Sequence, residues 1–233
     1  MRVISYNLRE GHASGELVSL VDRFDPDVLC LQECGSTGLP DNIGPLHLAG
    51  ATLKNRLGLA LYYRRERFTL VAAEAFALKK SLHDHVLAPA DERLVGTFLR
   101  DEEEEREVVM ASFHAAPLTA FNSLRRAQIQ AAHARLRELG SSAPTLMVGD
   151  YNYPWFHKSL RARMVQAGYE LSLADQMTYA RYRYFKGHFD FATSVGLEIG
   201  AVRTLPAGAS DHRPIMVSAE YQTDADSEER ADA

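Results

Sequence analysis

Blocks of apolar residues, separated by short polar segments, divide the chain into short strands and a few helices. Val3 to Tyr6 and Val28 to Leu31 are nearly continuous apolar runs, typical of strands that are buried on both faces. Between them, residues 17–21 place leucine and valine at helical spacing. The pattern therefore predicts that the chain opens with a strand, a helix and a second strand.

Two hairpins are predicted next. Leu57 to Tyr63 and Phe68 to Phe76 read as strands, and a short charged segment between them predicts the first turn. Leu94 to Leu99 and Val108 to Phe113 predict a second hairpin, which places the acidic run from Asp101 to Glu105 at its tip.

The second half of the chain mixes helices and strands. An amphipathic helix is expected from Thr119 to Leu139, because apolar residues recur on one face and Gly140 can end it. The strand Thr145 to Val148 and a second helix, from Trp155 to Gln166, follow. Periodicity by itself predicts a mixed α and β class. The last strands are expected near Phe189, from Leu197 to Leu205 and from Ile215 to Glu220.

The composition is that of one enzyme-sized domain. With 233 residues, 46% of them hydrophobic, the chain can bury one large core, and we expect residues 1–221 to form a single domain. Residues 222–233 are polar and acidic and predict a disordered tail.

The apolar stretches are too short for a membrane segment and residues 1–7 run directly into a motif, so a cytoplasmic protein is expected. Cys30 and Cys34 are expected to be free thiols.

The formal net charge of −5 affects the choice of partner. Proteins that bind phosphate-rich polymers usually present a basic surface, and this chain has no general excess of lysine and arginine. The acidic run and the acidic tail are expected to be solvated surface. A nucleic-acid partner would therefore need a local basic region.

Polar residues with catalytic or metal-binding potential follow or end several predicted strands. One such position alone would carry little weight, because polar residues commonly end strands. Their number and order, spread over about two hundred residues of the chain, are the informative feature. These residues are Asn7, Glu33, His114, Asp150 with Asn152, Asp190, and Asp211 with His212.

This order of motifs resembles the endonuclease/exonuclease/phosphatase superfamily, the deoxyribonuclease-I-like metal-dependent phosphoesterases, from Arg2 to about Tyr221. The resemblance implies an α+β fold: a four-layer α/β/β/α sandwich with two mixed sheets face to face. It also implies hydrolysis of phosphate esters with Mg²⁺ or Mn²⁺. The abasic-site endonucleases have a tyrosine-bearing segment where this chain has His114, so that branch fits less well. Other histidines, such as His12, lack a comparable context.

Glu33 is the expected metal ligand. The segment Leu31-Gln32-Glu33 delivers a carboxylate from the end of a buried strand, and Mg²⁺ needs few protein oxygens because it keeps several waters. The resemblance places Asn7 and Asp211 beside the metal. The alternatives are a partly exposed strand end for Glu33 and a turn-capping role for Asn7.

The resemblance gives five residues catalytic roles. Asp150 would orient or deprotonate the attacking water and Asn152 would hold a phosphoryl oxygen, although a simple Asx turn would look similar. His212 would contact the phosphoryl oxygen, while Asp190 accepts a hydrogen bond from the other ring nitrogen of His212. His114 completes the set, as a general acid or as a donor to the phosphoryl oxygens.

Residues 179–186 interleave aromatic and basic side chains, which suits stacking of bases and contact of Arg181 and Arg183 with a phosphate backbone. The alternative is a strand with one aromatic face in the core and its arginines in solvent. Asn122 is a candidate substrate contact or part of an ordinary helix surface.

We expect a nuclease-type phosphodiesterase, with nucleic acid among the candidate substrates and no protein partner implied. The alternatives are a small-molecule or phospholipid phosphoesterase and a catalytically silent binding module on the same fold.

Overall fold

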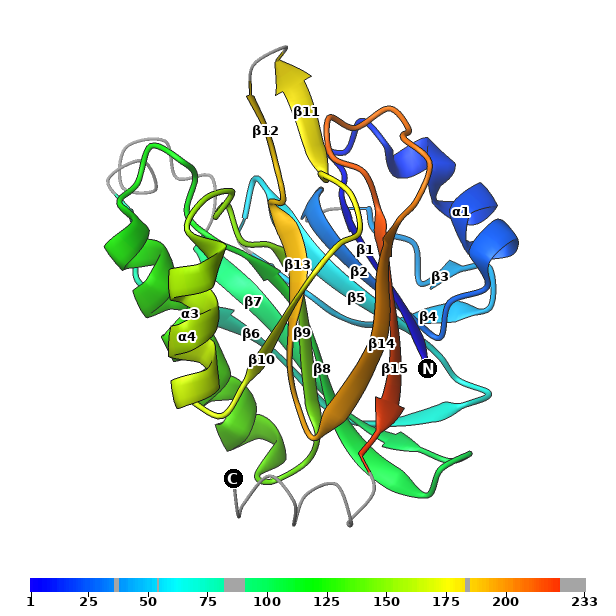
Figure 1. Ribbon diagram of the computed structural model, residues 1–233. Coiled ribbons are helices and arrows are strands. Elements are labelled where there is room, and N and C mark those ends of the chain that lie inside the picture. The colour runs from blue at the N-terminus through cyan, green and yellow to red at the C-terminus, as the bar shows by residue number, and fades with distance from the viewer. Residues whose placement is uncertain (36–37, 54, 82–90, 183–184, 223–233) are drawn as a thin grey trace.

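Two β-sheets lie face to face in the computed structural model, and helices cover their outer faces (Figure 1). The α+β class and the four-layer sandwich of two mixed sheets are therefore confirmed. The structure describes residues 1–35, 38–53, 55–81, 91–182 and 185–222.

The first sheet has seven strands in the order β14-β15-β1-β2-β5-β4-β3. β1 and β2 run parallel, and the other neighbouring pairs run antiparallel. β1 and β2 are buried almost throughout, as their apolar runs predict. The strands are β1 (Arg2–Asn7), β2 (Val28–Cys34), β3 (Asn42–Ile43), β4 (Leu46–Ala51), β5 (Gly58–Arg64), β14 (Leu197–Thr204) and β15 (Ile215–Tyr221).

The second sheet has six strands in the order β10-β13-β9-β8-β7-β6, and its parallel pair is β8 and β9. The predicted hairpin with an acidic tip is confirmed as β7 and β8. The strands are β6 (Phe68–Ala77), β7 (Glu92–Asp101), β8 (Arg106–His114), β9 (Thr145–Asp150), β10 (Glu170–Leu173) and β13 (Asp190–Val195).

Helices α3 and α4 lie on the outside of the second sheet, and α1 lies on the outside of the first (Figure 1). Three hydrophobic clusters hold these layers together: one between the sheets, one beneath α3 and α4, and one beneath α1. Each helix thus buries one apolar face, which is the main source of its stability. The helical segments are η1 (Ser14–Glu16), α1 (Leu17–Phe24), α3 (Asn122–Gly140) and α4 (His157–Gln166).

The predicted hairpin between Leu57 to Tyr63 and Phe68 to Phe76 is wrong. β5 pairs with β2 and β4 in the first sheet, whereas β6 pairs with β7 in the second. The turn between them therefore carries the chain from one sheet to the other. Arg67 stabilises this crossing, because its guanidinium lies 2.9 Å from Asp101 of the second sheet and 3.4 Å from Asp27, next to β2. Alternating apolar residues show which face of a strand is buried, but not which strand lies beside it.

Two short strands, β11 (Tyr179–Tyr182) and β12 (Phe185–Gly187), form a separate antiparallel pair. This pair, which we call the arm, projects beyond the end of the sandwich where β1 and β9 finish (Figure 1). The aromatic and basic segment noted in the sequence therefore belongs mainly to the arm rather than to the core sheets.

Buried polar side chains join the two sheets. Gln32 of β2 donates a hydrogen bond of 2.9 Å from Nε2 to Ser112 Oγ on β8. Ser112 Oγ in turn donates to the carbonyl of Leu31 at 2.9 Å, and Ser5 Oγ donates to Gln32 Oε1 at 3.2 Å. These bonds link β1, β2 and β8 inside a mainly apolar interior.

Within the described parts of the chain, none of the helices has the length and apolar character needed to cross a membrane. Cys30 and Cys34 are buried free thiols, as expected, and burial raises the pKa of Cys34 to about 12.

Residues 223–233, most of the predicted disordered tail, lie outside the described residues. Gln222 is anchored, because its carbonyl accepts a hydrogen bond from Arg106 at 2.9 Å.

His133 makes the stability of the fold depend on pH. Its ring stacks on Tyr169 with centroids 3.7 Å apart, and Nε2 lies 2.9 Å from Thr193 Oγ1. Burial, with a smaller contribution from Arg137, lowers the pKa of His133 to about 3. The unfolded chain then binds one more proton than the folded chain between pH 6.5 and 3, so stability is lost as the pH falls through this window.

We therefore expect His133→Gln, which keeps a hydrogen-bonding side chain without titrating, to flatten the decline of the unfolding free energy with falling pH. The difference in slope should approach about 1.4 kcal/mol per pH unit between pH 6 and 4. Urea unfolding across this range measures it, with His47→Gln on β4 as the matched control. Parallel slopes for wild type and His133→Gln would contradict the assignment.

Candidate active site

The polar residues at the strand ends meet at one end of the sandwich. β1 and β2 are parallel, and so are β8 and β9, so the carboxyl ends of each pair lie together. A cavity of about 430 Å³ opens there. It is lined by Arg9, Glu10, His12, Glu33, Leu57, Arg93, His114, Pro117, Leu118, Asp150, Asn152, Tyr179, Phe189, Asp211 and His212.

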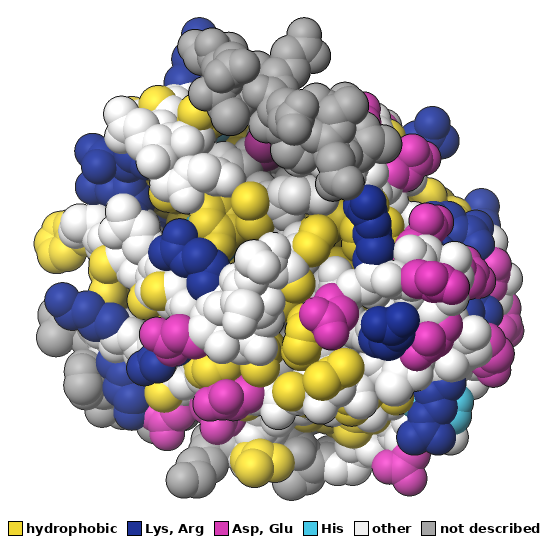
Figure 2. All heavy atoms as spheres, turned by 90° about the horizontal axis from the view of Figure 1, so that it is seen from below, with side chains coloured by type: hydrophobic (Ala, Val, Ile, Leu, Met, Phe, Trp, Pro, Cys, Tyr) yellow, Lys and Arg dark blue, Asp and Glu magenta, His cyan; other side chains and the backbone are white. Residues whose placement is uncertain are grey.

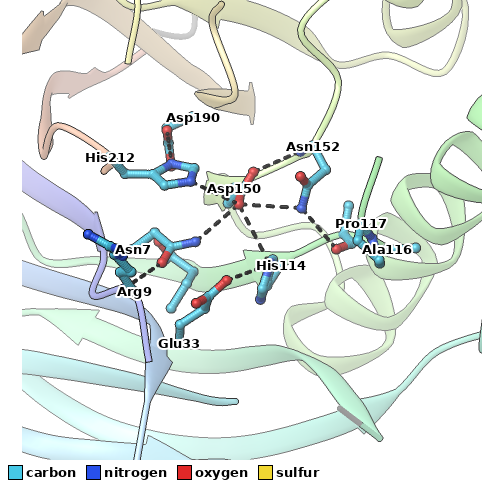
Figure 3. A network of polar contacts seen from close by, with 12 residues as sticks. Asn7, Arg9, Glu33, His114, Ala116, Pro117, Asp150, Asn152, Asp190 and His212 are labelled. Atoms are coloured by element: carbon cyan, nitrogen blue, oxygen red, sulfur yellow. Dashed lines mark hydrogen bonds and ion pairs between the residues drawn. The ribbon is translucent and has the colours of Figure 1, made fainter. Parts of the chain in front are cut away.

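Asp150, the last residue of β9, lies at the centre of this site (Figure 3). Its Oδ2 atom accepts hydrogen bonds from Asn7 Nδ2 at 3.1 Å and from Asn152 Nδ2 at 3.3 Å. The Nε2 atoms of His114 and His212 lie 3.6 and 3.8 Å from the same oxygen. Groups from both sheets thus converge on one carboxylate oxygen.

Glu33 reaches the site through an irregularity in β2. The register with β5 places Gln32 opposite Leu59 and Cys34 opposite Gly58, so Glu33 is the additional residue of a β-bulge. Its φ of 52° lies in the left-handed region. The carboxylate accepts a hydrogen bond from the backbone N–H of Glu10 at 3.1 Å and lies 3.8 Å from His114 Nε2.

The segment after β9 combines a turn with the site. Asp150 Oδ1 accepts a hydrogen bond from the backbone N–H of Asn152 at 2.8 Å, so the Asx turn considered from the sequence is present. The same turn brings the Asn152 side chain to Asp150 Oδ2 and to the carbonyl of Ala115. Gly149 is required just before it, because a Cβ there would lie 1.9 Å from the carbonyl oxygen of Phe113.

Asp190 and His212 form the second part of the site. Asp190 begins β13 and is paired in register with Asp150, whereas His212 lies in the loop before β15. His212 Nδ1 lies 2.8 Å from Asp190 Oδ2, which is the contact expected from the sequence. With its proton on Nδ1, the imidazole directs Nε2 towards Asp150 and the cavity.

Burial and neighbouring charges set the protonation of this group. Burial raises the pKa of Asp150 to about 7; the positive charge of His212 opposes this shift, and the negative charge of Asp190 adds to it. Burial by itself disfavours the charged form of His212, but the carboxylates of Asp190 and Asp150 outweigh it and raise the pKa of His212 to about 10. At neutral pH His212 is therefore an imidazolium held between two carboxyl groups.

Several side chains at this site have the chemistry of metal ligands. Asp150, Asp190 and His212 place one ligand atom each within 4.8 Å of one another. Glu33 and Asp211, which line the cavity, carry further carboxylate oxygens, and Asn7 at the end of β1 carries an amide oxygen. The Asn7 amide oxygen accepts a hydrogen bond from the Arg9 backbone N–H at 3.0 Å, which fixes the orientation of the side chain.

Of the three predicted substrate contacts, the structure describes the side chain of Asn122, which is not among the residues that line the cavity. Asn122 is half-buried at the start of α3, and its amide oxygen accepts a hydrogen bond from Arg125. Arg181 belongs to β11, but its side chain and the whole of Arg183 lie outside the part of the chain that the structure describes. The roles proposed for these three residues stay predictions.

The structure adds residues that the motifs did not reveal. His12, set aside for want of a motif, lines the cavity together with Arg9, both in the loop after Asn7. Buried Arg93 donates from Nη1 to the carbonyls of His114 and Ala115 at 3.0 and 2.9 Å, which supports the end of β8 from beneath. An arginine in the otherwise apolar segment 93–99 was a signal that could have found it.

The chain is similar in sequence to a curated protein. Protein angel of Drosophila melanogaster is 26% identical over 164 residues, which are 64% of this chain and 44% of that protein. The chain thus spans less than half the length of this curated relative.

Two solved structures illustrate the range of similar proteins. Danio rerio TDP2, complexed with a single-stranded DNA product, has a TM-score of 0.74 and 14% identity, covering 94% of this chain and 98% of that one. The mannosyl-6-phosphatase Bt3783 of Bacteroides thetaiotaomicron has a TM-score of 0.72 and 16% identity, covering 95% and 100%. At these identities the likeness concerns the fold.

The match to a family covers nearly the whole chain and includes the residues that converge on the cavity. Residues 4–212 match the Endonuclease/Exonuclease/phosphatase family, from β1 to the His212 loop. The chain therefore belongs to the endonuclease/exonuclease/phosphatase family.

Proposed function

We propose that the protein hydrolyses phosphate esters with the help of a divalent metal ion, and that it acts as a phosphodiesterase of nuclease type. The observation that supports this most is the set of four side-chain nitrogens around Asp150 Oδ2 (Figure 3). Such a set can bind the oxygens of a phosphoryl group and the water that attacks it. Membership of the family supports the same chemistry.

The donor set fits Mg²⁺ or Mn²⁺. Glu33 and Asp211 offer carboxylate oxygens and Asn7 offers an amide oxygen, and hard divalent cations prefer such ligands. We prefer these residues to the group of Asp150, Asp190 and His212, because that group is buried and two of its members are already paired with each other, with 2.8 Å between His212 Nδ1 and Asp190 Oδ2. When bound, the ion supplies positive charge that neutralises the phosphoryl oxygens.

The protein residues would divide the remaining work. Asp150 orients the attacking water and accepts its proton at Oδ2, in line with its position at the centre of the site. His212 donates from Nε2 to a phosphoryl oxygen, and Asn152 holds a second oxygen through Nδ2. His114 would protonate the leaving oxygen; its Nε2 atom lies 3.8 Å from Glu33 and 3.6 Å from Asp150, and the residue lines the cavity.

The arm and the distribution of surface charge bear on whether the substrate is a polynucleotide or a small phosphoester. Figure 2 shows the end of the molecule opposite the arm, where basic and acidic side chains lie around apolar ones. With a net charge of −5, contacts to a polynucleotide would have to lie near the cavity, and the basic residues of the arm are the candidates. The DNA-bound TDP2 supports a nucleic-acid substrate, whereas Bt3783, named as a phosphatase of a mannosyl phosphate, keeps the small-molecule alternative in view.

A catalytically silent binding module would be expected to lack part of the site. Here the residues expected to act are present and gathered at the cavity, which favours an enzyme. We keep a cytoplasmic location as a proposal, supported by the two buried free thiols, because reducing compartments preserve such groups.

The first prediction for the active site concerns the affinity of Glu33 for Mg²⁺. Glu33→Gln keeps the shape of the side chain but removes its charge, so Mg²⁺ affinity should fall at least about tenfold while the thermal midpoint stays close to that of wild type. Isothermal titration calorimetry with MgCl₂ measures the affinity. Glu74→Gln, the same change at an exposed position of β6, is the control. Equal Mg²⁺ affinity in Glu33→Gln and wild type would remove Glu33 from the ligand set.

The second prediction tests the role of His114. A sugar alkoxide leaving group, whose alcohol has a pKa of about 15, needs a proton, whereas nitrophenolate, with a pKa of about 7, does not. His114→Ala should therefore lower kcat/KM for alkoxide-leaving esters by roughly 10²–10⁴ and for nitrophenyl esters far less. The measurement compares both ester types at saturating Mg²⁺. Parallel losses would instead assign His114 to the charge of the non-bridging oxygens.

The third prediction tests for a polynucleotide substrate. Arg181→Ala with Arg183→Ala should weaken binding of single-stranded DNA and flatten the dependence of log Kd on log salt, because fewer counterions are released. Fluorescence anisotropy at several salt concentrations measures both. Arg135→Ala with Arg163→Ala, an equal charge change on exposed positions of α3 and α4, should leave the salt slope unchanged. If the arm variant also keeps the wild-type slope, the arm does not contact the backbone of the polymer.

A further inference from the structure

Thr178 touches both segments that carry the Asp190–His212 pair. This fully buried residue lies just before β11, and its Oγ1 atom accepts hydrogen bonds from the backbone N–H groups of Phe189 and Asp190, each at 3.0 Å. Its carbonyl accepts a hydrogen bond of 2.7 Å from the backbone N–H of Arg213. The Thr178 backbone N–H donates to the carbonyl of Gly187 at 3.0 Å.

These contacts matter because the pair spans two separate sheets. Asp190 begins β13 of the six-stranded sheet, and His212 precedes β15 of the seven-stranded sheet. Strand pairing therefore does not fix the distance between the two side chains, which is 2.8 Å from Oδ2 to Nδ1. Thr178 connects the two backbones at this point, with its hydroxyl on the side of Asp190 and its carbonyl on the side of His212.

The next residue, Tyr179, holds the imidazole ring itself. Tyr179 and His212 form an isolated antiparallel bridge, and their rings lie 4.8 Å apart at 60°. The ring of Phe189 lies 6.0 Å from the imidazole at 88° and 4.6 Å from Tyr179. His212 thus contacts two aromatic rings, and Tyr179 is also the first residue of the arm.

We propose that Thr178 is a positioning residue, whose hydroxyl and carbonyl set the Asp190–His212 hydrogen bond, and that Tyr179 connects this pair to the base of the arm. The catalytic consequence rests on the proposed function, because it assumes that His212 contacts the phosphoryl group. Removing the hydroxyl would leave two buried backbone N–H groups without their acceptor, so the start of β13 would shift to satisfy them. A displacement of even about 1 Å at a catalytic group can cost two orders of magnitude in rate.

Thr178→Val and Thr178→Ser separate this role from general stability. Valine keeps the shape without the acceptor, so kcat for a nitrophenyl phosphodiester at saturating Mg²⁺ should fall roughly 10- to 100-fold, with KM within about twofold of wild type. Serine restores the acceptor and should keep kcat within about threefold. Thr193→Val is the matched control, because Thr193 is a buried β13 hydroxyl that contacts His133 and Tyr151 rather than the Asp190–His212 pair. Thermal unfolding of all three variants accounts for any loss of folded protein.

A second measurement does not depend on activity. The proton on His212 Nδ1 should give a far-downfield ¹H NMR signal because it is hydrogen-bonded to Asp190, and its loss in His212→Asn assigns it. We expect this signal in wild type, Thr178→Ser and Thr193→Val, and its loss or displacement in Thr178→Val.

The possible outcomes separate the two proposals. If Thr178→Val keeps both the signal and kcat, or if Thr193→Val loses kcat to the same extent, the positioning role is wrong. If the wild type hydrolyses no phosphoester but the signal changes in Thr178→Val alone, the proposed function is wrong while the positioning of His212 by Thr178 stands.

Discussion

The hydrogen bond between Gln32 and Ser112 fixes how the two sheets lie against each other beneath the site, and Ser5 holds the Gln32 amide from the neighbouring strand. Apolar side chains in a sandwich tolerate small displacements, because hydrophobic contact has little directionality. A buried amide does not, since an unpaired polar group costs about 1–3 kcal/mol. Gln32 is the neighbour of Glu33, Ser112 lies two residues before His114, and Ser5 lies two residues before Asn7. The bonds that align the sheets therefore also align the side chains that share the cavity.

Much of the architecture could be predicted because local patterns determine it. The apolar runs of β1 and β2 indicate burial on both faces, and the periodicity of α3 indicates one apolar face. The assignment of β5 and β6 to different sheets could not be predicted in this way. It depends on contacts between strands distant in the sequence and on the bridge that Arg67 makes between Asp27 and Asp101.

The residues of the site also divide into those that the sequence could predict and those that it could not. Asn7 and Asp150 could be proposed because each ends a recognisable strand. Asp190 instead begins β13, and the antiparallel register of β13 with β9 brings it beside Asp150. His12 reaches the cavity through the geometry of a loop that has no marker in the sequence, whereas Arg93, near the beginning of β7, is marked only by its charge within an apolar segment. Thr178 is harder still to find, because its contribution lies in the hydroxyl and carbonyl contacts that it makes within the folded chain.

The backbone of Glu33 has a consequence for engineering. A glutamate in the left-handed region is strained by about 1 kcal/mol or more, whereas glycine adopts the same conformation freely. A redesign that optimised thermal stability alone would therefore tend to choose glycine at position 33 and would delete the carboxylate at the cavity. At position 33, thermal stability and retention of the site therefore favour different residues. Stabilising substitutions should be sought instead in the hydrophobic clusters beneath α1, α3 and α4.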